Sequence, residues 1–432
     1  MVDWRLRKVF RLSNFRARIS ITQKISLAGL AENSVVIRAL SLRATAVLLK
    51  AAQVIILVRL FGESEFGIYS IALSVFLLTM LVGRLGLDHY ILKEAASSDE
   101  DTRARLTRLS YFSSIPAVIA AAAGYAFVTA FYSQNVATSF LVLGLSAPLY
   151  ATMWNSIFLL RGLGRVNISI FLFEVIGPLS LLAIAFLARD LPYALAAAFF
   201  LSTLVVAVGA RLALGRVPAV EKDTARRGES PLRSVAQAKS FYAFSLIEGV
   251  QSLLDSLVIG FFLRPVDVTF YAIIMRITTL ILLPVTITTI YANNIAARFS
   301  RNDLASGWHA LRKFTHLNLA FSLFAFLGAI LLLPLVNMIF DVEFTNEASM
   351  AYVAVAMARF FQGATATVRS ALFMGGHERG LSLLSVMVLV PYSCALVAFT
   401  PTYGISFVGF SVLGFALAFG IFSFWYLRKK II

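Results

Sequence analysis

The feature that most constrains this chain is a series of apolar stretches, each about 20 residues long, that recurs along most of its length. A helix of that length crosses the hydrocarbon core of a bilayer, which is roughly 30 Å thick. The chain is 59% hydrophobic and 14% charged, with a mean hydropathy of +0.83, which excludes a soluble globular protein. The sequence therefore predicts an all-α polytopic membrane protein with about 12 transmembrane helices. The expected spans are 36–60, 66–88, 107–132, 137–160, 167–188, 191–213, 239–263, 267–296, 316–340, 348–373, 381–400 and 403–427.

The distribution of positive charge predicts the orientation of these spans. Thirty of the 38 Lys and Arg residues fall in the loops and chain ends on one side. The opposite loops are short, and Arg189 and Arg264 are their only basic residues. Because loops rich in Lys and Arg stay in the cytoplasm, we expect both termini to be cytoplasmic and the number of spans to be even. The same asymmetry explains the net charge of +16, so we do not expect nucleic-acid binding.

The longest interior loop divides the predicted helices into two sets of six. This loop, residues 214–238, is polar and basic and contains Pro and Gly. We expect it to be a cytoplasmic linker between a first lobe, 36–213, and a second lobe, 239–427. A basic arm, 1–35, and a basic tail, 428–432, are expected to be cytoplasmic or interfacial.

Possible targeting signals and the cysteine content restrict the class of protein further. The basic arm has no continuous apolar run and is therefore not a secretory signal peptide, although its Arg-rich composition leaves a mitochondrial transit peptide open. Cys394 is the only cysteine, which excludes an internal disulfide. The sequence shows no Cys/His cluster, and we expect neither a metal nor a bound cofactor.

Several short motifs lie near the ends of the predicted helices. They are RLFGESEFGIY at 59–69, GLD at 86–88, LKE at 92–94, LRGLGR at 160–165 and LDSLVIG at 254–260, with Tyr271 following. Together they resemble Wzx-type polysaccharide flippases of the multidrug/oligosaccharidyl-lipid/polysaccharide exporter (MOP) superfamily, over about residues 36–427. The resemblance implies a two-lobed fold, similar to that of the MATE transporters, and a transporter rather than an enzyme.

The same resemblance implies a substrate and partners. The substrate would be a polyprenyl-pyrophosphate-linked oligosaccharide, moved from the inner to the outer leaflet of a bacterial inner membrane for O-antigen or exopolysaccharide synthesis. The implied partners are this lipid-linked oligosaccharide, membrane lipids and a polysaccharide polymerase.

Several cations lie inside predicted spans, where topology does not explain them. At about 1.5 Å per residue, Lys50, Arg276 and Arg359 lie roughly 18, 13 and 16 Å from a membrane surface. A charge at that depth costs at least about 2.5 to 3.5 kcal/mol, so it faces a cavity or a partner. Arg43 shares a helix face with Lys50. We predict that these four residues line a cationic cavity for the pyrophosphate, the alternative being structural ion pairs or snorkelling.

Three carboxylates reach a similar depth: Glu174, Glu248 and Asp255. A buried carboxylate either stays ionised beside a cation or takes up a proton, so these residues are candidates for coupling transport to Na⁺ or H⁺. The alternative is a structural ion pair, for instance Glu248 or Asp255 with Arg276. A few aromatic residues inside spans, such as Tyr150, Trp154 or Tyr242, are candidates for stacking on sugar rings, although the sequence singles out none of them and most of the 37 Phe residues must face lipid or other helices.

Other functions remain in competition with the flippase. A multidrug exporter of the same superfamily, coupled to Na⁺ or H⁺, mostly moves organic cations, which suits a cationic midplane poorly. A glycan polymerase or ligase needs a large outer loop, and the predicted outer loops are short. A major-facilitator carrier has a loop signature that residues 83–89 lack.

Overall fold

The structure, a computed structural model, describes residues 34–95, 100–215, 231–283, 285, 304–340, 344–374 and 377–431. All regular elements in these ranges are helices. The first group is α2 (Ser34–Phe61), α3 (Glu63–Gly83), α4 (Leu87–Ala95), α5 (Glu100–Phe112), α6 (Ser114–Phe131), α7 (Gln134–Gly144), α8 (Ala147–Gly162), α9 (Val166–Ile170), the π-helix η2 (Phe171–Ile176), α10 (Gly177–Leu187) and α11 (Ala194–Leu214). The second group is α13 (Pro231–Phe262), α14 (Pro265–Thr279), the 3₁₀-helix η3 (Leu280–Leu282), α16 (Leu304–Phe340), α17 (Asn346–Met374) and α18 (Glu378–Ile431).

The predicted all-α membrane fold is confirmed. Each predicted span is helical over nearly all of its described residues. In the described part of the chain, nine helices are long and apolar enough to cross a membrane, or ten if the bent pair α7 and α8 forms one span. One of the nine, α18, contains two predicted spans joined at Gly404, whose φ of 65° and ψ of −157° suit a residue without a side chain. The total of 12 spans and the cytoplasmic termini stay predictions.

A proline explains a widened turn in the fifth predicted span. Pro178 has no backbone N–H and cannot bond the carbonyl of Glu174, four residues earlier. The preceding segment Phe171–Ile176 is a π-helix, and Glu174 lies within it. Single-turn π-helices often occur at functional sites, and here the widened turn carries a charged side chain inside the membrane-spanning part.

Part of the predicted central linker, 214–238, is helical. Helix α13 begins at Pro231, a favoured first residue of a helix, and so includes 231–238. The remainder of the predicted linker, 216–230, lies outside the described residues, as do residues 1–33 of the predicted basic arm.

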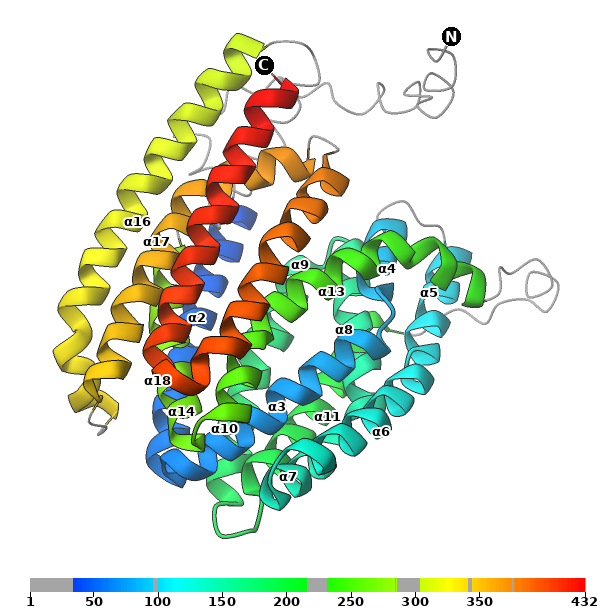
Figure 1. Cartoon of the computed structure of the whole chain (residues 1–432). Coiled ribbons are helices and arrows are strands. Elements are labelled where there is room, and N and C mark those ends of the chain that lie inside the picture. Colours follow the sequence, from blue (N-terminus) through cyan, green and yellow to red (C-terminus); the bar gives the residue numbers. More distant parts are fainter. Residues whose placement is uncertain are drawn as a thin grey trace.

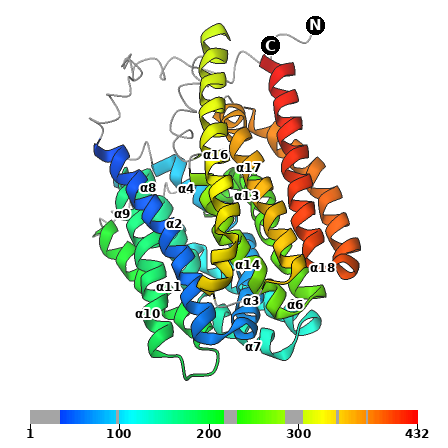
Figure 2. The ribbon, with the colours of Figure 1, turned by 90° about the vertical axis from the view of Figure 1, so that its left-hand side faces the viewer.

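The helices gather on two sides of the molecule. Helices α6, α7, α8 and α11 lie on one side, and α16, α17 and α18 stand side by side on the other (Figure 1). Helix α3 packs on α6 and α7 of the first side, and α13 and α14 pack on α18 and α17 of the second. The two sides meet where α3 packs against α13 and α14. The view turned by 90° shows α2 beside α10, with α14 next to it (Figure 2).

The two sides meet closely at the start of α3. A Cβ atom added to Gly67 would lie only 2.0 Å from the backbone oxygen of Pro265, at the start of α14. The Thr269 hydroxyl donates a hydrogen bond of 2.6 Å to the backbone oxygen of Glu63. The backbones of α3 and α14 are therefore in direct contact at this end, because position 67 has no side chain.

We predict that Gly67→Val destabilises this contact by about 1–3 kcal/mol, because the new side chain must push backbone apart. Gly328→Val on α16 is the matched control, since no heavy atom lies within 4 Å of a Cβ at that position. The measurement is the unfolding temperature of the purified protein in detergent. Equal unfolding temperatures for the two variants would show that α3 and α14 do not depend on this contact.

Candidate functional site

A cavity of about 600 Å³ lies between the two sides of the molecule. This volume is within the range of small-molecule binding sites. Helices α3, α4 and α8 line one wall, and α13, α14, α17 and α18 line the other. The residues that α3 contributes, Leu77 and Leu81, come from its second half, so the cavity lies away from the Gly67 contact. The lining includes three arginines and two aspartates: Arg84, Arg359, Arg369, Asp88 and Asp255.

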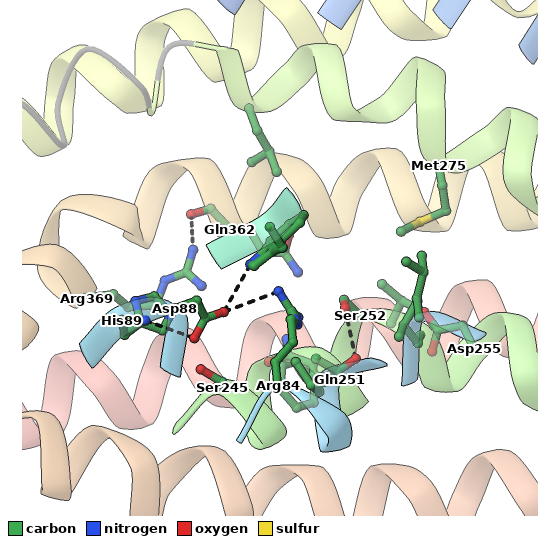
Figure 3. A pocket seen from close by; sticks show the side chains of 18 of the residues that line it. Arg84, Asp88, His89, Ser245, Gln251, Ser252, Asp255, Met275, Gln362 and Arg369 are labelled. Atoms are coloured by element: carbon green, nitrogen blue, oxygen red, sulfur yellow. Dashed lines mark hydrogen bonds and ion pairs between the residues drawn. The ribbon is translucent and has the colours of Figure 1, made fainter. Parts of the chain in front are cut away.

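The first charged group in the wall is the pair Arg84 and Asp88, which are 6% and 4% exposed. Arg84 Nη1 lies 3.3 Å from Asp88 Oδ2, and Trp154 Nε1 donates a hydrogen bond of 3.1 Å to the same oxygen. The Arg84 guanidinium also lies 4.4 Å from the centroid of the Trp154 ring. Figure 3 shows Arg84 and Asp88 facing one another. Because removal of one partner from a buried pair leaves the other charge uncompensated, the two residues stabilise each other.

The second charged group lies on α17. Arg359 donates hydrogen bonds to Gln362 Oε1 at 2.7 Å and to Met275 Sδ at 3.2 Å. Among the described residues, no carboxylate lies within 4.0 Å of Arg359, and its buried Nε has no hydrogen-bond partner. Arg369 donates to the main-chain oxygen of Gln362 at 2.9 Å. The direct contacts of the Arg359 guanidinium among the described residues are thus with neutral groups.

The Asp255 side chain bonds to hydroxyl groups rather than to a cation. It is 4% exposed and accepts hydrogen bonds from the hydroxyls of Tyr271 on α14 and Tyr392 on α18. These two contacts join three helices at one carboxylate. In Figure 3 Asp255 lies at the opposite end of the drawn pocket from Arg369. The structure shows no ion pair between Asp255 and Arg276, the structural alternative considered from the sequence.

Two of the residues predicted for the cavity do not line it. Lys50 Nζ lies 3.7 Å from Glu174 Oε2, and Arg161 Nη2 lies 3.8 Å from Glu174 Oε1. Lys50 is thus held in an ion-pair cluster with Glu174 and Arg161, which is the structural alternative, and it is not among the residues that line this cavity. Arg276 is exposed on α14, close enough to Lys50 to repel it, but is not part of the cavity wall. The side chains of Arg43 and Glu248 lie outside the described residues.

Three charged residues lie in the interior although the sequence did not indicate it: Arg84, Asp88 and Arg161. Arg84 and Asp88 lie at the inner end of the predicted span 66–88, and Arg161 directly follows the span 137–160, so Arg84 and Arg161 were counted with the loop cations. The backbone after α3 turns through Leu85 and Gly86, whose φ values are 55° and 69°, and returns Asp88 toward Arg84. The spacing of four residues between Arg84 and Asp88 is the signal that could have indicated the pair.

A family model for polysaccharide biosynthesis proteins matches residues 56–303, more than half of the chain. The chain belongs to this family. The match confirms the resemblance to polysaccharide flippases that the motifs indicated. A comparison of the sequence with curated proteins gives no significant match.

Solved structures show the fold. An inward-facing multidrug-resistance transporter of the MATE family, in the MOP superfamily, aligns with a TM-score of 0.71 and 16% identity over 89% of this chain and 94% of its own. The lipid II flippase MurJ, in an inward closed conformation, aligns with a TM-score of 0.70 and 14% identity over 90% of this chain and 86% of its own. A MOP superfamily transporter from Pyrococcus furiosus aligns with a TM-score of 0.57 and 15% identity over 91% of this chain and 93% of its own. Family and fold together place the chain among multi-pass membrane transporters of the MOP superfamily rather than among enzymes.

Proposed function

We propose that this protein is a flippase that moves a polyprenyl-pyrophosphate-linked oligosaccharide from the inner to the outer leaflet of a bacterial inner membrane. The family supports a role in polysaccharide synthesis, and the fold is shared with a lipid II flippase. A polysaccharide polymerase that uses the delivered oligosaccharide is the proposed partner. The positive-inside rule supports cytoplasmic termini.

The observation that carries this proposal is Arg359. Its guanidinium lies in the cavity wall, and among the described residues it has no carboxylate within 4.0 Å. A charge at this depth is costly unless it is compensated, and a diphosphate would compensate it through paired hydrogen bonds to the guanidinium. Asp88 is already engaged by Arg84, and Asp255 by two tyrosines, so neither neutralises Arg359 through a direct contact.

The walls of the cavity support transport by alternating access. They come from both sides of the molecule, which contact each other closely at Gly67 and Pro265. Movement of one side against the other would break that contact and open the cavity at the opposite face. During this movement the lipid tail would stay in the bilayer while the diphosphate and the glycan cross inside the cavity.

The multidrug exporter is the alternative function. Organic cations would meet Arg359 and Arg369 in the cavity wall, where like charges repel. Asp88 and Asp255 also line the cavity and would favour a cation, but Arg84 and two tyrosine hydroxyls already engage them. Drug efflux without a defect in surface polysaccharide would nevertheless reverse this ranking.

We predict that Arg359→Ala abolishes polysaccharide export, because the diphosphate loses the guanidinium that compensates for its lost hydration. Arg359→Lys should retain partial export, since it keeps the charge and loses the forked geometry. The measurement is surface polysaccharide together with the amount of lipid-linked precursor in the cytoplasmic leaflet. The matched control is Arg189→Ala, whose side chain is 56% exposed in an outer loop. Normal export by a well-expressed Arg359→Ala protein would refute the cationic-cavity model.

We propose Asp255 as the residue that couples transport to Na⁺ or H⁺. Asp255→Asn keeps a side-chain oxygen near Tyr271 and Tyr392 but removes the charge, so it should abolish gradient-driven transport without loss of the folded protein. The measurement is precursor flipping in proteoliposomes with an imposed Na⁺ or H⁺ gradient, one at a time. If the variant responds to both gradients as the wild type does, Asp255 is structural.

A further inference from the structure

Three aromatic rings form a ladder in the cavity wall opposite α17. Tyr150, Trp154 and Phe158 are spaced four residues apart on α8, and all three line the cavity. The centroids of Tyr150 and Trp154 are 5.8 Å apart with an interplanar angle of 27°, and those of Trp154 and Phe158 are 5.7 Å apart at 28°. At about 1.5 Å per residue the ladder extends about 12 Å along the helix, which is longer than one sugar ring.

We propose that this ladder is a sugar-stacking surface, so that the glycan binds along α8 while the diphosphate binds to Arg359 on α17. The inference rests on the proposed flippase function and assigns the two ends of its substrate to different walls. An aromatic face is rich in π-electron density, whereas the C–H face of a sugar ring carries slight positive charge, so the two attract as aromatic edges and faces do.

Cations stiffen the ladder. Arg84 lies 4.4 Å from the Trp154 ring centroid, and Arg161 lies 5.1 Å from that of Phe158. The indole N–H of Trp154 is fixed by its hydrogen bond to Asp88, and the Phe173 ring lies perpendicular to the indole with the two ring centroids 4.9 Å apart. A rigid surface loses little conformational entropy when a ligand binds, which favours affinity.

The accessibility of the rings identifies the residue that matters most. Tyr150 is 6% exposed and Phe158 is 8% exposed, whereas Trp154 is half-buried. Trp154 is therefore the ring that a sugar can contact, through the part of its indole that Arg84 leaves uncovered, and the two buried rings support it from either side along α8. The remaining cavity lining includes Ser252 and Gln251, which can hydrogen-bond to sugar hydroxyls.

Trp154 presents an aromatic face and donates a hydrogen bond to Asp88, and two variants separate these two roles. Trp154→Phe keeps an aromatic face but loses the hydrogen bond to Asp88, whereas Trp154→Leu loses both. Phe158→Leu removes a second ring that has no part in the Asp88 bond. Folding of each variant is checked by its unfolding temperature and by gel filtration.

The experiment uses calorimetry on the full chain in nanodiscs with two probes. One probe is inorganic pyrophosphate, and the other is the oligosaccharide released by mild acid from the precursor that accumulates in cells lacking the protein. We expect Trp154→Leu to weaken binding of the oligosaccharide about tenfold and to leave pyrophosphate binding within about twofold, with Trp154→Phe close to the wild type. Arg359→Ala should show the reverse pattern.

The possible failures are distinguishable. If no precursor accumulates, or if the wild type binds neither probe, both the proposed flippase function and the proposed sugar surface are wrong. If the wild type binds pyrophosphate but not the oligosaccharide, or if folded Trp154→Leu and Phe158→Leu bind the oligosaccharide normally, only the sugar surface is wrong. Equal loss in Trp154→Phe and Trp154→Leu would assign Trp154 to positioning Asp88.

Discussion

The structure depends on one electrostatic constraint, which is that an ionised side chain deep in a membrane protein needs a compensating group. Three carboxylates meet this need in different ways: Asp88 with Arg84, Glu174 with Lys50 and Arg161, and Asp255 with two tyrosine hydroxyls. Arg359 differs, because among the described residues only neutral groups bond its guanidinium. A guanidinium in a cavity wall that only neutral groups contact directly is suited to an anionic ligand.

The place of this cavity follows from how the two sides of the molecule meet. The backbones of α3 and α14 touch at Gly67 and Pro265, which closes one end of the interface. Toward the other end of α3 the sides separate, and Arg359 and Arg369 lie in one wall while the aromatic rings of α8, with Arg84 beside them, lie in the other. One cavity can thus offer a charged surface and an apolar surface to the same ligand, which suits a glycan joined to a diphosphate.

Much of the fold could be predicted from the sequence, because span length and loop charge are local properties. The depth of a residue within its predicted span also follows from the local sequence, so Lys50 and Arg359 were both expected near the membrane midplane. Which of them faces the cavity depends on packing between distant helices, and only Arg359 does so. The π-helix that brings Glu174 to Lys50 arises from Pro178, whereas Arg84 turns inward through Leu85 and Gly86 beyond the end of α3. Neither arrangement is visible in hydropathy.

The most direct test is a cryo-electron-microscopy structure of the full chain in nanodiscs, loaded with the lipid-linked precursor extracted from cells that lack the protein. The account predicts density for the diphosphate within hydrogen-bond distance of the Arg359 guanidinium, with the glycan inside the cavity. Density for the diphosphate beside Lys50 and Arg276, with the cavity empty, would contradict it.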